Sequence, residues 1–178
     1  MKEIALHLLD IAQNSVSAGA TKLELSLVER DGVLTMTVTD NGKGMTAEFL
    51  AQVMDPFTTT RTTRKVGMGI PLLRLSAQLA GGDVSIDSTP GVGTTVRATF
   101  LQSDIDCLPL GDLPGTLCVF LQGAPEQLHT VYLHETERGS FRLDTQELRD
   151  ILGPVPLSTP EVALWLRDYL QEQEAALI

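Results

Sequence analysis

Asp40 is the residue of this chain whose type and position point most directly to chemistry. In the segment 34–40, Leu34, Met36 and Val38 alternate with threonines, which predicts a β-strand with one apolar face. Asp40 has the parity of that apolar face, so its carboxylate is expected to point toward the core, where a charge is costly unless it is hydrogen-bonded or paired. The alternative is a strand that ends in a solvated Asp-Asn-Gly turn.

A turn rich in glycine follows Asp40 at once, with the sequence Asn41-Gly42-Lys43-Gly44-Met45. Its two glycines permit positive φ and a close approach of the backbone to a ligand. A buried hydrogen-bond acceptor beside such a turn predicts a slot for a flat molecule that carries donors, such as adenine. Thr94 shares the parity of the apolar residues in its own predicted strand, so its hydroxyl is expected to face the same slot.

Asp10 and Asn14 are four residues apart in a predicted helix and therefore lie on one face of it. A carboxylate and an amide oxygen suit Mg²⁺, which prefers a few protein oxygens together with phosphates and water. Asn14 fits the role of metal ligand, and Asp10 the role of a group that orients or deprotonates an attacking hydroxyl or water. The alternative is a polar helix face that is simply solvated.

A second pair of glycines, in Gly67-Met68-Gly69, precedes another predicted helix. Exposed amides and the positive end of a helix dipole favour phosphate at such a place. Arg61, Arg64 and Lys65 lie just upstream and could add positive charge. Taken alone, a Gly-X-Gly is also consistent with an ordinary turn.

The elements that must position these residues alternate between helix and strand. Apolar spacing and turn residues predict helices over 3–17, 47–54 and 71–80, and strands over 22–28, 34–40, 84–88 and 94–101. The segment 55–65 is polar and basic without an apolar period, which predicts a mobile loop. The fold class expected is α+β, with a mostly antiparallel sheet and helices on one face.

The segment 108–115, rich in proline and glycine, predicts a boundary after a first domain over 1–105. Beyond it we expect a small acidic region over 116–178 that serves a protein partner or a homodimer. Its predicted elements are strands over 116–122 and 130–134, a helix over 145–151 and a terminal helix that begins near Thr159.

The distribution of charged residues and the absence of long apolar runs exclude some classes of function. Residues 1–100 carry 9 basic and 10 acidic side chains, whereas residues 101–178 carry 4 basic and 13 acidic ones. This balance argues against nucleic-acid binding, which needs a basic surface, and it suits a basic protein partner or a solvated surface. Neither a signal peptide nor an apolar run of about 20 residues is present, and the two cysteines have no metal-like spacing, so a cytoplasmic location is expected.

Four motifs, in the chain order Asn14, 40–45, 67–69 and 93–94, resemble those of the GHKL ATPases, the Bergerat-fold superfamily of histidine kinases, gyrase B, MutL proteins and heat-shock chaperones. The resemblance covers about residues 3–101. Residues 10–20 resemble the N box, 40–45 and 67–69 the two glycine boxes, 55–61 the F box of histidine kinases, and Gly93-Thr94 the last motif.

The resemblance implies an ATP site with Mg²⁺. By it, Asp40 accepts the adenine amino group with help from a water held by Thr94, and Gly42, Gly44 and Met45 shape the purine slot. Asn14 holds the metal, and Asp10 is the candidate catalytic residue. Gly67, Met68 and Gly69 contact the phosphates through their backbone amides. Arg61 and Lys65 bind the nucleotide from a lid over 55–65.

Three differences from the family pattern bear on function. Asp10 stands where the family usually has a glutamate base, and Lys65 stands where the second glycine box usually begins with a further glycine. Histidine kinases carry their phosphoacceptor histidine on a helical hairpin before the N box, whereas nine residues precede Asp10 here, and His7 lies within the N-box helix.

Two functions of different classes are therefore expected. The first is a kinase that uses Mg-ATP to act in trans on a protein partner, as the anti-sigma serine kinases of the family do. The second is a nucleotide-gated protein-binding module or slow ATPase, in which ATP orders the lid and changes partner binding.

Overall fold

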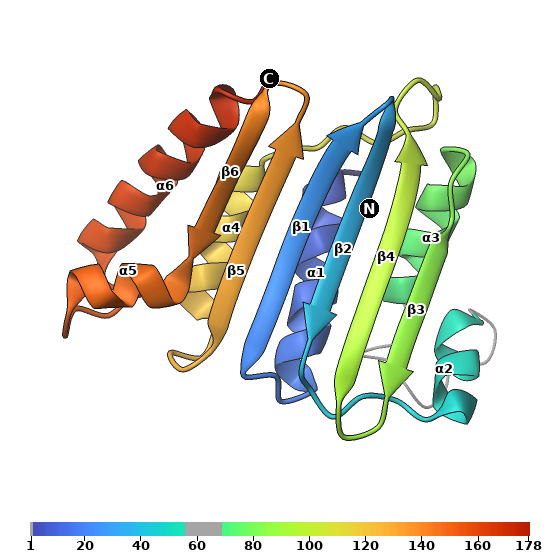
Figure 1. Cartoon of the computed structure of the whole chain (residues 1–178), viewed down its shortest axis with the longest axis horizontal. Helices are drawn as coiled ribbons and strands as arrows, with labels where there is room; N and C mark the ends of the chain where they lie inside the picture. The colour runs from blue at the N-terminus through green and yellow to red at the C-terminus, as the bar shows by residue number, and fades with distance from the viewer. Residues whose placement is uncertain (1, 56–68) are drawn as a thin grey trace.

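The computed structural model describes residues 2–55 and 69–178. Its strands form one six-stranded sheet in the order β3-β4-β2-β1-β5-β6 (Figure 1). The strands are β1 (Lys22–Arg30), β2 (Val33–Asp40), β3 (Val84–Thr89), β4 (Gly93–Leu101), β5 (His129–Thr136) and β6 (Gly139–Asp144). The helices are α1 (Ile4–Ser17), α2 (Ala47–Met54), α3 (Gly69–Leu79), α4 (Leu113–Gly123), α5 (Thr145–Leu152) and α6 (Pro160–Ala175).

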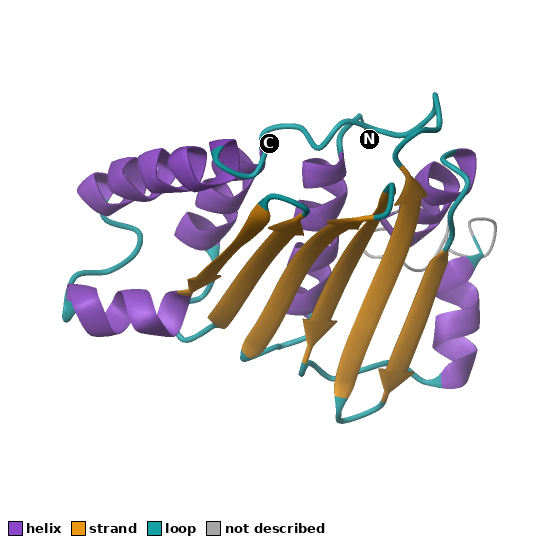
Figure 2. Cartoon of the chain, turned by 45° about the horizontal axis from the view of Figure 1, so that its top comes forward, coloured by secondary structure: helices purple, strands orange, loops and turns teal. Residues whose placement is uncertain are grey.

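The sheet is mixed but mostly antiparallel. Each neighbouring pair is antiparallel except β1 and β5, which run parallel and join the two halves of the chain. Helices α1, α3 and α4 lie side by side on one face of the sheet (Figures 1 and 2). The α+β fold class, with a mostly antiparallel sheet and helices on one face, is therefore confirmed.

Strand β2, which ends at Asp40, is paired on both sides and begins at a tight hairpin. Asp31 and Gly32 both have positive φ, at 54° and 75°, as a two-residue turn of the primed type requires. The turn fixes the register of β1 against β2, in which Leu23 lies opposite Asp40. On the other side β4 places Thr94 opposite Asp40.

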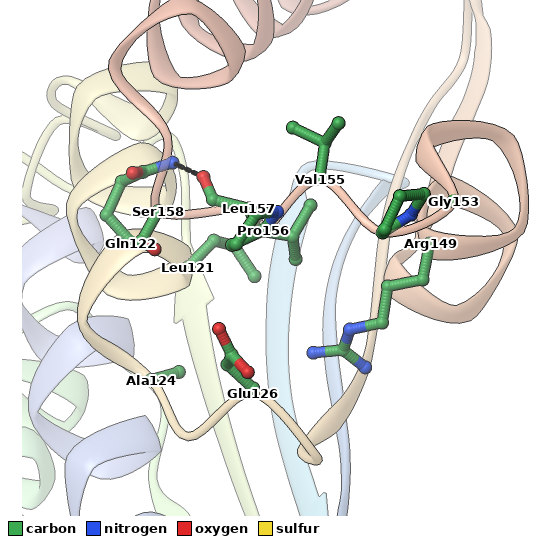
Figure 3. Close-up of a pocket in the computed structure, with 11 residues that line it drawn as sticks. Leu121, Gln122, Ala124, Glu126, Arg149, Gly153, Val155, Pro156, Leu157 and Ser158 are labelled. Carbon is green, nitrogen blue, oxygen red and sulfur yellow. Dashed lines mark hydrogen bonds between the residues drawn. The ribbon is translucent and has the colours of Figure 1, made fainter.

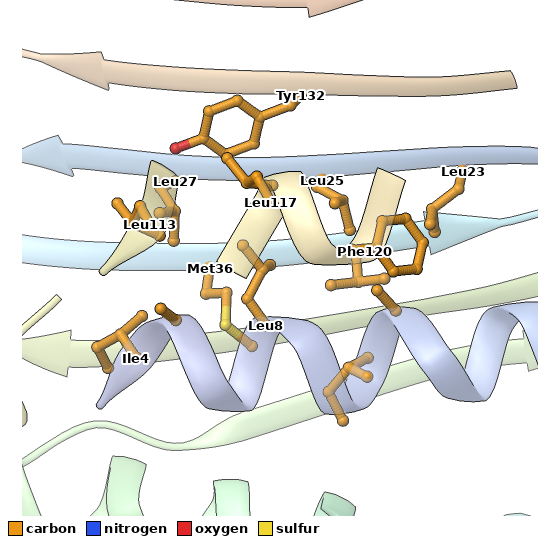
Figure 4. Packing of buried hydrophobic residues seen from close by; sticks show 14 of the residues in the cluster. Ile4, Leu8, Leu23, Leu25, Leu27, Met36, Leu113, Leu117, Phe120 and Tyr132 are labelled. Carbon is orange, nitrogen blue, oxygen red and sulfur yellow. The ribbon is translucent and has the colours of Figure 1, made fainter. Parts of the chain in front are cut away.

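One hydrophobic cluster runs beneath the whole sheet. Leu8 of α1, Leu25 of β1 and Met36 of β2 meet Leu117 of α4 and Tyr132 of β5 (Figure 4). The side chains of all five are at most 2% exposed. Residues 116–178 thus extend both the sheet and the core of the N-terminal half.

The strand predicted over 116–122 was wrong, because these residues belong to helix α4. The β-branched residues Thr116 and Val119 favour a strand locally. However, the buried positions Leu113, Leu117 and Leu121 follow helical spacing, and Asp112 caps the helix by accepting a hydrogen bond from the Gly115 N–H at 3.0 Å. Tertiary burial on the sheet outweighs local propensity here.

Most other elements lie within two residues of their predicted ends. Helix α3 begins at Gly69 rather than residue 71, and strand β1 continues to Arg30. Strand β6 was not predicted, although Phe141 and Leu143 alternate with polar residues along it. Across the described residues, no helix combines the length and the apolar character that crossing a membrane requires.

The C-terminal helix is tied to the sheet by a buried polar network around His134 of β5. The His134 ring is 1% exposed, with Nε2 at 2.7 Å from Glu29 Oε2 and Nδ1 at 2.5 Å from Glu174 Oε2. Tyr132 Oη donates to the other oxygen of Glu174 at 2.7 Å. Because both ring nitrogens face carboxylates, the network favours the imidazolium form, in which both nitrogens donate.

Burial by itself lowers the pKa of His134, but hydrogen bonds and charges from Glu174 and Glu29 outweigh it and raise the pKa above 6.5. Such a group stabilises the fold fully below pH 6.5, and this stability is lost as pH rises through the folded-state pKa. His7 behaves in the opposite sense, because burial lowers its pKa to about 4 and its contribution is lost as pH falls from 6.5 toward 4.

We therefore predict that the free energy of unfolding falls as pH rises above about 6.5, the unperturbed pKa of histidine. His134→Gln should lower stability at pH 6 by about 2 kcal/mol or more, because it leaves two carboxylates without their cation. The variant should also flatten the decline above that pH. Urea unfolding over a pH series, with His129→Gln as the control, measures both effects. If the free energy of unfolding of His134→Gln fell with pH as steeply as that of the wild type, His134 would not be the group responsible for the decline.

Candidate functional site

A cavity of about 170 Å³ opens between α1, the end of β2 and the start of β4. Its lining combines an apolar wall with a few polar side chains. The apolar residues are Ile11, Ala18, Met45, Phe49, Ile70 and Val96, and the polar ones include Asn14, Ser15, Asp40 and Thr94. An apolar slot with a few fixed polar groups is typical of a site for a flat heterocyclic ligand.

Asp40 presents its carboxylate to this cavity from the last position of β2. Ser15 of α1, which is 2% exposed, donates its hydroxyl to Oδ2 at 2.6 Å. The Gly42 N–H donates to Oδ1 at 2.9 Å. Each oxygen is thus oriented by one protein donor and keeps acceptor capacity for a ligand. Asp40 is half-buried and hydrogen-bonded rather than exposed in a solvated turn.

The two glycines after Asp40 are required by close contacts. A Cβ on Gly42 would lie 2.8 Å from Ala18 Cβ. Gly44 has φ of 69°, and a Cβ there would lie 2.1 Å from the carbonyl oxygen of Thr89. The loop after β2 is therefore pressed against α1 on one side and the β3–β4 turn on the other, which agrees with the close backbone approach predicted from the sequence.

Ser88 of β3 fixes the hydroxyl of Thr94. The two hydroxyl oxygens are 2.8 Å apart, and Ser88 Oγ also accepts the Met45 N–H at 2.8 Å. Thr94 lies opposite Asp40 in the β2–β4 register. The arrangement places one hydroxyl and one carboxylate on neighbouring strands at the same end of the cavity.

Asp10 and Asn14 meet the start of α3 beside this cavity. A Cβ on Gly69 would lie 2.0 Å from Asp10 Oδ2 and 3.8 Å from Asn14 Nδ2, so a larger residue there would displace the Asp10 carboxylate. Burial raises the pKa of the Asp10 carboxyl above its usual value. Asn14 Nδ2 is buried and has no hydrogen-bond partner among the described residues. A buried amide in this state is a polar group available to a ligand.

Eight of the predicted site residues therefore lie together at one end of the sheet: Asp10, Asn14, Asp40, Gly42, Gly44, Met45, Gly69 and Thr94. The other predicted ligand contacts, Arg61, Lys65, Gly67 and Met68, lie outside the described residues, as does the predicted lid beyond Asp55. Those assignments stay predictions.

Sequence reasoning missed two hydroxyls that orient the site, Ser15 and Ser88. Ser15 lies four residues after Ile11 on the buried face of α1, and a hydroxyl on an apolar helix face is the signal that could have revealed it. Ser88 lies in an edge strand where serine is common, and only the β3–β4 register brings it to Thr94.

Comparison with known proteins agrees with this geometry. Residues 1–104 match the family model described as histidine kinase-, DNA gyrase B- and HSP90-like ATPase. The match covers more than half of the chain, and the chain belongs to this family, with the Bergerat-type α+β fold. Family members bind ATP, which supports ATP as the ligand of the cavity.

Individual relatives are histidine kinases and sensor proteins. The chain is 34% identical over 100 residues to the histidine protein kinase DivJ of Caulobacter vibrioides, which covers 54% of this chain and 17% of that protein. It is 29% identical over 113 residues to the cell-division control histidine kinase PdhS of Brucella anthropi, and the match covers 56% of this chain and 11% of PdhS. It is 32% identical over 104 residues to the sensor protein EvgS of Escherichia coli O157:H7, and the match covers 55% of this chain and 9% of EvgS. The chain thus matches less than a fifth of the length of each of these three relatives.

We predict that Asp40→Asn lowers adenine-nucleotide affinity by about 100-fold, since a charged hydrogen bond of up to about 3 kcal/mol is lost. An asparagine amide can present a donor where the adenine amino group also presents one. Ser15→Ala should have a smaller effect in the same direction, because it removes only one group that orients Asp40. Isothermal calorimetry with ATP and adenosine diphosphate measures both.

The matched control is Asp87→Asn, which makes the same chemical change at an exposed carboxylate on β3. Its affinity should equal that of the parent protein. Unchanged affinity in Asp40→Asn would show that the adenine amino group is bound elsewhere.

Proposed function

We propose that this protein is a kinase that binds Mg-ATP and transfers phosphate in trans to a protein partner. Its membership of the ATP-binding family and the slot around Asp40 support the nucleotide part of the proposal. The transfer is a matter of positioning and charge neutralisation, which amides at a helix start, a metal ion and a carboxylate together supply.

The observation that favours transfer to another protein is the state of the three histidines. His7 is fully buried, with Nε2 at 3.0 Å from Ser76 Oγ between α1 and α3. His129 Nε2 lies 2.8 Å from Asp144, and His134 is enclosed between two glutamates. Each histidine of these 178 residues therefore already has a structural partner: His7 and His134 are buried, and His129, whose side chain is 32% exposed, is paired with Asp144.

Asn14 and Asp10 fit the roles of magnesium ligand and catalytic group. The amide of Asn14 is buried without a partner among the described residues, and turning it by 180° about its last side-chain bond exchanges its nitrogen for an oxygen. That oxygen is a ligand of the kind that Mg²⁺ prefers, and the ion would neutralise phosphate charge. Asp10, with its raised pKa, can accept the proton of an attacking hydroxyl.

The acidic C-terminal region is the part we assign to a basic partner protein or to self-association. Residues 101–178 carry 13 acidic and 4 basic side chains, and α6 exposes Leu164 and Trp165. These features equally suit the second candidate function, a nucleotide-gated binding module or slow ATPase, because partner binding does not itself require phosphate transfer.

Incubation with ATP labelled at the γ-phosphate, together with co-purifying proteins, distinguishes the two functions. We predict label on a partner protein, and about 100-fold less label with Asp10→Asn, the scale expected for loss of a general base. ATP affinity should remain, because Asp10 does not line the cavity. Release of free phosphate alone would favour the slow ATPase, and neither product would favour the binding module.

We predict that Asn14→Ala abolishes the increase in ATP affinity that Mg²⁺ causes, while affinity without metal changes little. Calorimetry with ATP, with and without Mg²⁺, gives this difference directly. Gln13→Ala is the matched control, since Gln13 is the exposed neighbour of Asn14 on α1. If Mg²⁺ still tightened binding to Asn14→Ala by the parent factor, the metal ligand would be another residue.

A further inference from the structure

A second cavity, of about 210 Å³, lies in the C-terminal half, between the end of α4, the end of α5 and the segment 153–158. It shares no lining residue with the nucleotide slot. From its shape and charges we propose that it is a binding site for a small zwitterion of the α-amino acid class. This site is independent of the proposed kinase activity.

Two opposite charges face this cavity without neutralising each other. Glu126 points its carboxylate into the space from the loop after α4, and Arg149 points its guanidinium in from α5 (Figure 3). No ion pair within 4 Å involves either side chain in the described part of the chain. Arg149 donates from Nη2 to the carbonyl oxygen of Leu128 at 3.1 Å, which fixes the guanidinium and leaves other N–H groups available.

A ligand that carries both an ammonium and a carboxylate matches this arrangement. The carboxylate of the ligand would pair with Arg149, whose planar donors suit that shape, and the ammonium would pair with Glu126. Helices α4 and α5 both end at the cavity wall, at Gly123 and Leu152, and the C-terminal end of a helix favours positive charge. A purely anionic ligand would meet Glu126 and two helix C-termini unfavourably.

The rest of the lining suits a small ligand with a short apolar side chain. The walls include Leu121, Val155 and Leu157, with Pro156 between the last two. Gln122 donates to the carbonyl oxygen of Leu157 at 2.5 Å, so the segment that carries Leu157 is attached to α4 (Figure 3). Proline restricts the backbone of this segment, which lowers the entropy lost when a ligand binds. The cavity volume of about 210 Å³ leaves room for a small ligand of this kind.

Calorimetry and thermal-shift measurements on the full chain with each standard amino acid test the proposal. We expect one or more small aliphatic amino acids to bind at millimolar concentration or below. The N-acetyl derivative, which lacks the ammonium, and the amide derivative, which lacks the carboxylate, should each bind at least tenfold more weakly, since each loses one charged hydrogen-bonded pair.

Glu126→Gln is the decisive variant, because Glu126 is exposed and has no hydrogen bond or ion pair within the described residues, so its replacement should leave the fold unchanged. It should weaken amino-acid binding at least tenfold with the melting temperature and ATP affinity retained. Glu172→Gln, the same change at an exposed position of α6, is the control and should bind as the parent does. Arg149→Lys should weaken binding as well, because lysine loses the planar pair of donors.

The proposal is overturned if no amino acid binds at millimolar concentration. It is equally overturned if both derivatives bind as tightly as the free amino acid, or if Glu126→Gln and Glu172→Gln bind alike. Loss of ATP binding in Asp40→Asn leaves these results unaffected, so failure of this site and failure of the nucleotide site are separable.

Discussion

The site depends on the pair of hydrogen bonds that hold the Asp40 carboxylate, from the Ser15 hydroxyl at 2.6 Å and the Gly42 N–H at 2.9 Å. A carboxylate at the end of a strand, beside the core, is stable only when donors reach it. One donor comes from α1 and the other from the loop that follows β2. The position of Asp40 therefore requires the packing of α1 on the sheet and the compact course of the loop at the same time.

That requirement connects the cavity to the whole sheet. Helix α1 is held by Ile4, Leu8 and Ile11, which are buried beneath β1 and β2. Strand β1 is in turn paired with β2 on one side and with β5 on the other. The C-terminal half thus supports the central strands from which the site is built, and the His134 network contributes to the site through this support rather than through any contact with it.

Three of the candidate residues could be placed from the sequence because their positions depend on short spacing. Asp10 and Asn14 share a helix face, and Asp40 follows an alternating strand, so period and parity suffice to place them. The partners that orient the site were not predictable, since Ser15 reaches Asp40 across 25 residues and Ser88 reaches Thr94 through a hairpin register. For the same reason the sequence predicts a strand where α4 lies: its apolar, β-branched sequence is ambiguous until the neighbouring sheet selects which residues are buried.

The geometry around Gly69 also explains why an aspartate suits position 10 in a family where glutamate is usual. A Cβ on Gly69 would lie 2.0 Å from Asp10 Oδ2, so the carboxylate already fills the space against the first residue of α3. A glutamate on the same backbone would carry its carboxylate one methylene farther, into α3, unless α3 moved or the side chain turned away. Helix α3 cannot move alone, because Ile70, Leu73 and Ala77 are buried in the core. The shorter acid and the glycine opposite it therefore let α3 approach α1 closely without turning the carboxylate away.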